Sequence, residues 1–383
     1  MDFALTAEQE LVRSAAREFA EREVAPHARE WDRAEEIDRA LVSKLAAAGF
    51  LGAGWDDAYG GTGLDMLSYA LVVEELGKAD SSVRGIVSVN VGLVGKTIAR
   101  FGSEEQKREW LPRLASGDAL GCYALTEPGC GSDAAALATR AERNGERWRL
   151  TGSKTFITLG TWASVALVFA RTGDPGPRGI SAFLVATDAD GFEARPIKGK
   201  LGLRAQDTAE LSLDGVEVAD GSRLGELGDG FRIAMSALDN GRISLASGCV
   251  GIAQGCVDAS IAYAQQRQAF GRPIAGFQLV QELIAETAVE TDAARLLVWR
   301  AAALADTGGR HTLESSVAKL YASEVSVRAA NNAVQVFGGY GYVDEYPVGK
   351  YLRDARVTTL YEGTSQIQKL IIGRALTGES AFA

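Results

Sequence analysis

"GCYALTEPGCGSDAA", residues 121–135, is the stretch that decides the fold. From Gly129 to Ala134 it has the spacing G-x-G-x-x-A after a run that could form a strand, which is the pattern of a dinucleotide-binding phosphate loop. Such a loop needs a helix behind it and an acidic residue about 20 positions later, at the end of a second parallel strand. Here the chain runs into "ATRAERNGERWRL" (138–150), whose Asn-Gly pair at 144–145 predicts a β-hairpin. The glycines therefore indicate a loop that presents backbone N–H groups and hydroxyls to a ligand, in a fold without that dinucleotide-binding unit.

The rest of the chain falls into three parts of different texture. Residues 1–118 are predicted to be helical, because Thr6 and Gln9 have the spacing of a capping box and an apolar helical stripe follows them. Residues 119–228 are short β-rich runs between Gly, Asp and Pro clusters, with no helix long enough for a parallel crossover. Residues 229–383 are predicted to be helical again. We therefore expect an α+β multidomain fold in which antiparallel sheet, as a barrel or a sandwich, lies between two helical domains.

The C-terminal part has the composition of closely packed helices. Residues 244–265 and 285–305 are rich in alanine, which lets neighbouring helices approach each other. Residues 312–337 are predicted to form a helix, because apolar residues keep a helical stripe there. The members of the stripe are Leu313, Val317, Leu320, Val327 and Val334.

Composition and charge exclude several classes of function. The 383 residues carry a formal net charge of −10, whereas a nucleic-acid-binding protein needs a basic surface, so no nucleic acid is expected as a partner. The four cysteines have no C-x-x-C spacing and only two histidines are present, so no metal site and no Ser-His-Asp hydrolase is expected. No stretch approaches the roughly 20 uninterrupted apolar residues of a membrane span, so no membrane insertion is expected. The early acidic residues Asp2, Glu8 and Glu10 suit no targeting segment, and we expect a cytoplasmic location, or the mitochondrial matrix only if a transit peptide has been removed.

The stretch at 123–133, "YALTEPGCGSD", resembles the TEPGxGSD signature of the acyl-CoA dehydrogenases, a family that holds FAD without a dinucleotide-binding fold. Five further blocks resemble blocks of that family and follow the family's order, which makes the resemblance cover nearly the full length. These blocks are "TFIT" at 155–158, "LDNGR" at 238–242, "RQAFGRPIAGFQ" at 267–278, "QVFGGYGY" at 335–342 and "YEGTSQIQ" at 361–368. The resemblance implies an N-terminal helical domain (1–118), a middle antiparallel β-barrel domain (119–228) and a C-terminal four-helix bundle domain (229–383).

The resemblance also implies a reaction, the α,β-dehydrogenation of an acyl-CoA thioester to the trans-2-enoyl-CoA. Glu362 matches the family's catalytic base, and a carboxylate desolvated between an acyl chain and a flavin has the raised pKa that such a base needs. Without the resemblance, Glu362 would be explained as an acidic residue near the N-terminus of a helix that Thr364 caps. Some relatives place the base just before the arginine of the "LDxxR" block, but this chain has Gly241 there, which leaves Glu362 as the candidate. The backbone N–H of Glu362 and a flavin ribityl hydroxyl are the implied donors to the thioester oxygen.

Residues of the matching blocks are assigned to cofactor and substrate by the same resemblance. The implied contacts to the flavin ring are Tyr123, Leu125, Thr126, Phe156 and Thr158, with Phe156 at a position where many members have tryptophan. The implied contacts to the rest of FAD are Ser132, Arg267, Phe270, Gln278, Gln335, Gly338, Gly339, Thr364 and Gln366. The implied contacts to acyl-CoA are Ser132, Asp239, Arg242, Gly363 and Arg374. Structural explanations stand beside these assignments, a turn hydroxyl for Ser132 and a helix ion pair for Asp239 with Arg242.

Partners follow from the resemblance as well. Arg267 would meet the FAD pyrophosphate of a neighbouring subunit, so a homotetramer built as a dimer of dimers is implied, with an electron-transferring flavoprotein as the electron acceptor. "SVNVGLVG" at 88–95 offers small and β-branched residues, which favours a short or branched acyl chain. An acyl-CoA oxidase and a biosynthetic dehydrogenase that acts on an acyl-carrier-protein thioester remain alternatives on the same fold. A non-catalytic flavin-fold binding protein is a third alternative, against which the intact Glu362 argues.

Overall fold

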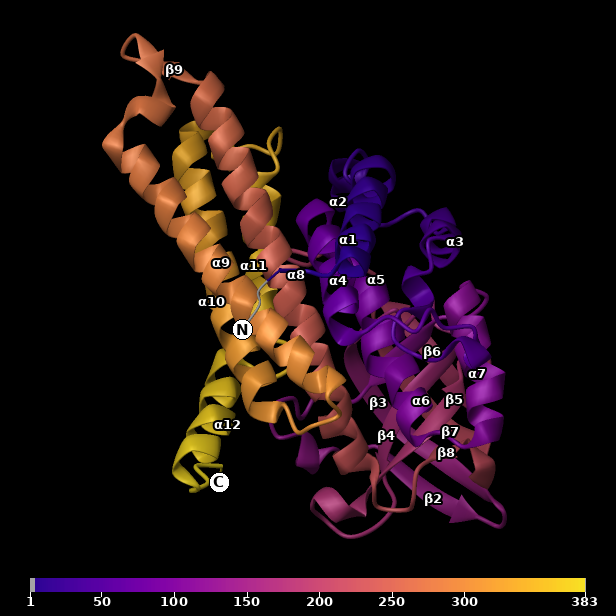
Figure 1. Ribbon diagram of the computed structural model, residues 1–383. Helices are drawn as coiled ribbons and strands as arrows, with labels where there is room; N and C mark the ends of the chain where they lie inside the picture. Colours follow the sequence, from indigo (N-terminus) through magenta and orange to yellow (C-terminus); the bar gives the residue numbers. More distant parts are fainter. Residues whose placement is uncertain (1–3, 383) are drawn as a thin grey trace.

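The computed structural model describes residues 4–382, and its N-terminal part is a cluster of helices, as predicted (Figure 1). The predicted capping box is present, since the Gln9 N–H donates to Thr6 Oγ1 (3.2 Å) and the Thr6 N–H donates to Gln9 Oε1 (3.0 Å). The first helix continues as a π-helical turn that ends just before Pro26. The elements are α1 (Ala7–Phe19), η1 (Ala20–Val24), α2 (Ala28–Ala34), α3 (Ala40–Ala47), η2 (Phe50–Gly52), η3 (Asp57–Tyr59), α4 (Met66–Ala79), α5 (Ser81–Val87), η4 (Ser88–Gly95), α6 (Lys96–Phe101) and α7 (Glu104–Ser116).

The middle part is a β sheet with strand order β6-β7-β3-β2-β4-β5-β8, and β1 pairs with β4 beside this path. The predicted Asn144-Gly145 hairpin joins β2 to β3 in antiparallel register. Two pairings differ from the antiparallel expectation: β2 meets β4 in parallel, with Arg140 opposite Arg171, and β1 runs parallel to β4, with Gly121 opposite Val165. The chain between these two strands contains the whole β2–β3 hairpin, and a connection of that length lets the second strand return in the same direction. The strands are β1 (Gly121–Ala124), β2 (Arg140–Asn144), β3 (Arg147–Thr158), β4 (Val165–Arg171), β5 (Ile180–Ala186), β6 (Phe192–Pro196), β7 (Thr208–Ala219) and β8 (Arg223–Leu224).

The C-terminal part is a bundle of long helices (Figure 1). Small residues bring these helices close to the N-terminal ones: a Cβ on Gly77 of α4 would lie 2.8 Å from the Cα of Gly248 in α8. At 37 residues α8 is long and apolar enough to cross a bilayer, but 72% of its most apolar window is buried within the protein, as in the core helix of a bundle. The elements are α8 (Gly230–Gln266), α9 (Gln278–Asp306), α10 (Thr312–Phe337), α11 (Val348–Thr358) and α12 (Ser365–Thr377), with the small hairpin β9 (Gln268–Ala269) and β10 (Arg272–Pro273) between α8 and α9.

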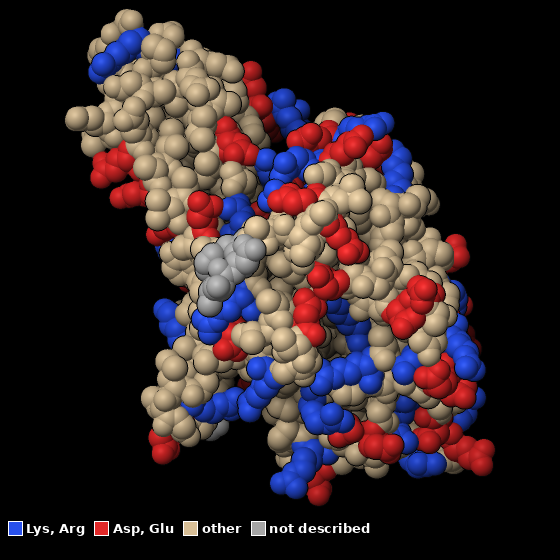
Figure 2. All heavy atoms as spheres, viewed as in Figure 1, with Lys and Arg blue, Asp and Glu red and all other residues tan. Residues whose placement is uncertain are grey.

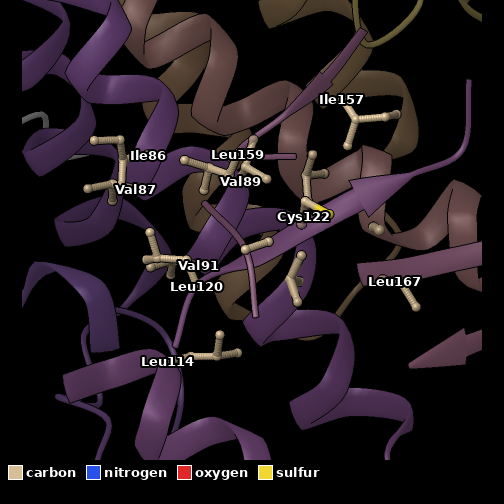
Figure 3. Close-up of a cluster of buried hydrophobic side chains, with 14 of the residues drawn as sticks. Ile86, Val87, Val89, Val91, Leu114, Leu120, Cys122, Ile157, Leu159 and Leu167 are labelled. Carbon is tan, nitrogen blue, oxygen red and sulfur yellow. The ribbon is translucent and has the colours of Figure 1, made fainter. Parts of the chain in front are cut away.

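The hydrophobic core is continuous where the N-terminal helices meet the sheet (Figure 3). Apolar side chains of α5, η4 and α7 pack here against side chains from β1, β3 and β4. The labelled members are Ile86, Val87, Val89, Val91, Leu114, Leu120, Cys122, Ile157, Leu159 and Leu167. Because this core fixes η4 against β1, it sets the position of the two walls that η4 and the loop after β1 contribute to the cavity described next.

Candidate active site

A cavity of about 770 Å³ opens where the three parts of the chain meet. Its walls come from segments far apart in the sequence: α5 with η4, the loop after β1, the end of β3, the start of α8, and the turn that leads into α12. Its volume lies within the range of small-molecule sites. The loop at residues 125–135 forms one of these walls. This glycine-containing stretch is not a dinucleotide-binding loop, but it does face a space large enough for a ligand.

Glu362 lies in a strained turn between α11 and α12. Its φ of 54° is left-handed, a conformation that few non-glycine residues adopt, and Gly363 follows with a φ of 90°. The buried side chain of Gln368 donates from Nε2 to the carbonyl oxygens of both residues, each at 3.1 Å. Lys319, also buried, donates from Nζ to the Gly363 carbonyl at 2.7 Å. Two buried side chains therefore hold the strained turn in place.

The Glu362 carboxylate faces the cavity without a full set of partners. Its Oε2 atom is buried and has no hydrogen-bond partner among residues 4–382. Burial raises the pKa of Glu362 to about 7, although the positive charges of Arg84, Lys319 and Arg242 oppose the rise. Near neutral pH this carboxyl can both accept and hold a proton, which is the property of a general base.

Gly241 makes room for this carboxylate. A Cβ atom at position 241 would collide with Oε2 of Glu362 and would lie 2.7 Å from Cδ2 of Leu93. A side chain at position 241 and the carboxylate of Glu362 would occupy the same corner of the cavity. The glycine at 241 therefore leaves that corner free for the carboxylate.

A second buried carboxylate, Glu127, follows the strand β1. Its Oε1 accepts a hydrogen bond from Lys154 Nζ at 2.8 Å, and the N–H groups of Ala138 and Thr139 donate to its two oxygens at 2.6 and 3.0 Å. Lys154 also donates to the carbonyls of Leu125 and Phe169. Burial raises the pKa of Glu127, but Lys154 and the donated hydrogen bonds outweigh burial and hold it below its usual value. This pair fixes the loop that carries Leu125 to the cavity.

The five residues predicted at the flavin ring all line the cavity: Tyr123, Leu125, Thr126, Phe156 and Thr158. Phe156 has a left-handed φ of 58° and its side chain is 69% exposed, so the backbone presents a large apolar ring to the open space. Gln206 donates from Nε2 to Thr158 Oγ1 at 3.0 Å, which leaves the Thr158 hydroxyl proton available for an acceptor in the cavity.

The residues predicted for acyl-CoA are also brought together, since Ser132, Asp239, Arg242, Gly363 and Arg374 line the same cavity. The ion pair between Asp239 and Arg242, which is the structural alternative to a substrate role, is present as well. Arg242 donates to Asp239 Oδ1 at 2.6 Å, and the other oxygen of Asp239 accepts from Thr312 Oγ1 at 2.7 Å. The Nε atom of Arg242 is buried and has no partner within the described part of the chain, so the pair does not use the whole guanidinium.

The remaining predicted FAD contacts do not line this cavity. Arg267, Gly338 and Gly339 border a separate hollow of about 760 Å³ beside the β9–β10 hairpin, at the other end of the bundle from the sheet (Figure 1). The predicted residues that line neither hollow are Phe270, Gln278, Gln335, Thr364 and Gln366. Thr364 caps α12, accepting from the Ile367 N–H at 3.2 Å, which is the structural role that the sequence indicated for it.

Comparisons with known proteins agree with this geometry. Family models of acyl-CoA dehydrogenases match the chain in three blocks: the N-terminal domain at residues 6–118, the middle domain at 122–216 and the C-terminal domain at 228–377. The chain is a member of the acyl-CoA dehydrogenase family. It is therefore an oxidoreductase, and the dehydrogenation of an acyl-CoA is its reaction.

Individual relatives of this acyl-CoA dehydrogenase support the same conclusion. The short-chain specific acyl-CoA dehydrogenase of Clostridium acetobutylicum is 43% identical over 97% of this chain and 98% of its own length. The solved structure of butyryl-CoA dehydrogenase from Megasphaera elsdenii is 40% identical, with a TM-score of 0.96 over 98% of this chain and 100% of that one. A chain in a solved structure described as the electron transferring flavoprotein of Acidaminococcus fermentans is 43% identical, with a TM-score of 0.97 over 99% of this chain and 100% of that one.

The acyl-CoA dehydrogenases are flavoproteins, and the residues of this cavity fit a flavin. The exposed ring of Phe156 offers an apolar surface, and the hydroxyls of Thr126 and Thr158 offer polar contacts on the neighbouring wall. The unpartnered Glu362 lies in the same space, so a flavin and an acyl chain together would desolvate it further.

Several residues of this acyl-CoA dehydrogenase's site were not found from its sequence. Gln368 and Lys319 act from buried helix positions, and Gln206 follows β6 in a segment without a family block. Arg84 and Arg310 line the cavity, and Arg84 is 2% exposed. An arginine inside the apolar run "SSVRGIVSVNVG" (81–92) was the one available signal, because arginine is rarely buried without a reason.

Proposed function

We propose that Glu362 removes the α-proton of a short-chain acyl-CoA thioester bound between its carboxylate and FAD. The observation that carries this proposal is the buried, unpartnered Oε2 atom of Glu362 in a cavity that residues of three separate parts of the chain enclose. A base for this step needs a pKa near neutral, and burial supplies it.

FAD, when bound, accepts the β-hydrogen of the acyl chain as a hydride. The residues that would hold its ring are Tyr123, Leu125, Thr126, Phe156 and Thr158. The buried Gln206 side chain, which donates to Thr158 Oγ1, would orient that hydroxyl so that its proton points toward an acceptor on the ring. Lys154 donates hydrogen bonds to the Leu125 carbonyl and to Glu127. This buried network would keep the loop that carries Leu125 rigid.

Stabilisation of the thioester oxygen is assigned to the backbone N–H of Glu362. This role is supported by the hydrogen bonds that Gln368 and Lys319 donate to carbonyl oxygens of the turn at residues 362–363. These bonds fix the turn and therefore the position of the Glu362 N–H. Donors fixed before the reaction stabilise developing negative charge without reorganisation in the transition state.

Cationic side chains support a CoA ester as the ligand form. Arg310 and Arg374 line the cavity, Arg242 keeps an unpartnered Nε atom there, and Ser132 adds a hydroxyl. These groups give an acidic chain the local positive charge that the phosphates of CoA require. A short chain is supported by the walls that Val89 and Leu93 form and by the names of the relatives, which include short-chain specific enzymes.

Assembly and electron transfer are parts of the same proposal. We propose a homotetramer, a dimer of dimers, in which Arg267, Phe270, Gln278, Gln335, Gly338 and Gly339 contact the FAD of a neighbouring subunit. In support, the bundle tip is mostly uncharged surface (Figure 2), and Phe270 and Leu279 there are 96% and 74% exposed. An electron-transferring flavoprotein is proposed as the acceptor, on the basis of the relative described above. We further propose domains at 1–118, 119–228 and 229–383, and a cytoplasmic location.

The test is an anaerobic spectrum of the purified protein reconstituted with FAD, taken before and after addition of butyryl-, octanoyl-, palmitoyl- or isobutyryl-CoA. Bleaching of the flavin by butyryl- or isobutyryl-CoA is the expected result. Bleaching only by an acyl-carrier-protein thioester, or reoxidation by oxygen as fast as by the flavoprotein acceptor, would favour the carrier-protein or oxidase alternative instead. Failure to retain FAD would contradict the proposal.

A further inference from the structure

Arg171, the last residue of β4, binds two loops through their backbone carbonyl groups. The three nitrogens of its guanidinium donate five hydrogen bonds, which go to the carbonyls of Ala135 (2.6 Å), Leu137 (3.2 Å from each of two nitrogens), Asp174 (2.9 Å) and Gly176 (3.2 Å). Within residues 4–382 no carboxylate pairs with this guanidinium. Its donors therefore serve to fix the course of the backbone in these two loops.

The first of these loops follows a wall of the substrate cavity. Residues 131–135, which we call the 131–135 wall, line the cavity one after another. Within the described chain, the hydrogen bonds of residues 128–134 all stay between residues 127 and 136. No strand or neighbouring helix holds the wall through hydrogen bonds, so its position depends on what anchors the chain just before and just after it.

The segment after the wall, residues 135–139, is held from two sides. The Glu127 carboxylate accepts hydrogen bonds from two backbone N–H groups of this segment, at 2.6 and 3.0 Å. The Arg171 guanidinium donates to two of its carbonyls, and the Arg171 backbone N–H donates to the Thr139 carbonyl at 2.7 Å. Because Glu127 also precedes the wall in the chain, one anion and one cation together close the loop that carries the wall.

The wall offers hydrogen-bond donors to a ligand. The backbone N–H groups of Gly131, Ser132 and Asp133 have no acceptor within the described chain, and the Ser132 hydroxyl has no partner there either. Consecutive N–H groups of this kind suit anionic oxygens, and both CoA and FAD contain a diphosphate. Such donors bind best when the backbone is already in place, because ordering a loop on binding reduces affinity.

We propose that Arg171 is a positioning residue, which holds the 131–135 wall in the conformation that binds the diphosphate of a ligand. This inference rests on the proposed function, which supplies the two candidate ligands, FAD and the CoA ester. Arg171 is not among the residues that line the cavity, so it acts through the wall and not by contact with the ligand. Its loss is therefore expected to weaken binding and to leave the chemical step at Glu362 unchanged.

The competing explanation is that Arg171 only closes the loop between β4 and β5. That role accounts for its bonds to Asp174 and Gly176, but not for the three bonds that it donates to Ala135 and Leu137. The two explanations differ in a measurable way. A purely structural arginine affects all ligands alike, whereas a positioning residue affects those that carry a diphosphate.

The experiment compares the full-length wild-type enzyme with Arg171→Met. The dissociation constant of FAD is measured by flavin fluorescence on the deflavinated enzyme. The kcat/KM of anaerobic bleaching is measured at saturating FAD with butyryl-CoA and with the butyryl thioester of N-acetylcysteamine, which has the same acyl group but no diphosphate. We expect either a dissociation constant of FAD about tenfold higher or a kcat/KM for butyryl-CoA about tenfold lower, with the truncated thioester and kcat itself changed less than about twofold.

Each of these two results supports the proposal and identifies the source of the diphosphate. A weaker affinity for FAD assigns it to the cofactor, and a selective loss with butyryl-CoA assigns it to the substrate. An unchanged affinity for FAD, together with equal changes or no change for the two thioesters, would overturn the proposal. If the wild-type enzyme itself binds no FAD and no thioester bleaches it, the proposed function fails, and this inference fails with it.

Two further variants separate positioning from folding. Thr172→Val is the matched control, because it removes the hydrogen bond between Thr172 and Ser181 (2.8 Å) in the β4–β5 loop and leaves the bonds to Ala135 and Leu137 in place. It should change both affinities less than about twofold, and an effect equal to that of Arg171→Met would overturn the proposal. Arg171→Lys has one donor nitrogen in place of three, so an intermediate effect is expected, and it provides the test if the methionine variant does not fold.

Discussion

Glu127 and Glu362 are two glutamates with buried carboxylate oxygens, one in the loop after β1 and one in the cavity wall, and their surroundings differ in opposite ways. Glu127 receives hydrogen bonds from Lys154 and from two backbone N–H groups, and its pKa is held below the usual value. Glu362 keeps one oxygen buried without any partner, and its pKa rises to about 7. The chemistry of the side chain is the same, so the difference lies in what the surrounding residues donate.

This difference teaches which carboxylate is structural and which is reactive. A satisfied carboxylate is stable as an anion and has little tendency to take a proton. An unsatisfied one away from solvent gains from protonation, which is the property that the proposed base requires. The same substitution at both positions makes the comparison testable.

Glu362→Gln is expected to have the largest effect on catalysis. Because the amide cannot accept the α-proton, the rate of flavin bleaching by the preferred thioester should fall about 1,000-fold or more. Stability at neutral pH should stay equal or rise, because a carboxyl whose folded pKa is raised destabilises the fold as pH increases through that pKa. Stopped-flow bleaching and urea unfolding measure the two quantities, and bleaching within tenfold of the wild-type rate would remove Glu362 from the mechanism.

Glu127→Gln is expected to show the reverse pattern, a large loss of stability and a much smaller loss of the bleaching rate. It leaves the buried ammonium of Lys154 without its counter-charge, which costs about 3–5 kcal/mol of unfolding free energy. In the molecules that still fold and bind FAD, the thioester should bleach the flavin far faster than it does in the Glu362 variant. Urea denaturation in parallel with the Glu362 variant provides the comparison, and a loss of activity with unchanged stability would contradict the structural role of Glu127.

Gly241→Ala is expected to lower the bleaching rate by about 100-fold, because the new methyl group displaces the carboxylate of Glu362 and a shift of about 1 Å at a reacting group costs that much. FAD binding should persist, since position 241 is not among the residues predicted at the flavin. The matched control is Gly373→Ala in α12, where an added Cβ meets no atom within 4 Å. Equal rates for both variants would show that Glu362 does not occupy the corner next to Gly241.

Gln368→Leu is expected to have the smallest effect of the series, about tenfold on kcat. The substitution removes both hydrogen bonds that hold the strained turn at Glu362 and Gly363, at about 0.5–1.5 kcal/mol each. The pKa read from the pH profile should shift with kcat, since the carboxylate then samples other positions. A variant that lost stability but kept both kcat and its pH profile would show that Gln368 does not position Glu362.

Much of the fold and part of the site could be predicted from the sequence. The capping box at Thr6 and the hairpin at Asn144-Gly145 were correct because both are short-range patterns with one dominant conformation. Glu362 and the five flavin-ring residues came from motif resemblance, and the structure brings them into one cavity.

Other features depend on contacts between segments far apart in the chain, and the sequence indicates them only weakly. In α10 the apolar stripe predicted the helix correctly, but residues such as Leu313 and Val317 are only half-buried. The fully buried face includes Ser315, Ala318 and Lys319, because small side chains allow close helix packing and Lys319 donates to the Gly363 carbonyl in the turn before α12. Arg84 was missed for the same reason, since the use of a polar residue in a core becomes visible only when its partners are known.

The most direct test of the central claim is the pH dependence of flavin bleaching between about pH 5 and about pH 9 under anaerobic conditions. Glu362 must be ionised to take the α-proton, so the rate should increase about tenfold per pH unit at low pH and level off above the pKa of about 7. Arg84, Arg242 and Lys319 also face this carboxylate, and only Lys319, whose pKa burial lowers to about 8, should alter the plateau. A rate that is already constant from about pH 5 upward would mean that Glu362 is an ordinary solvated carboxylate, and would contradict the claim that its missing partner makes it the base.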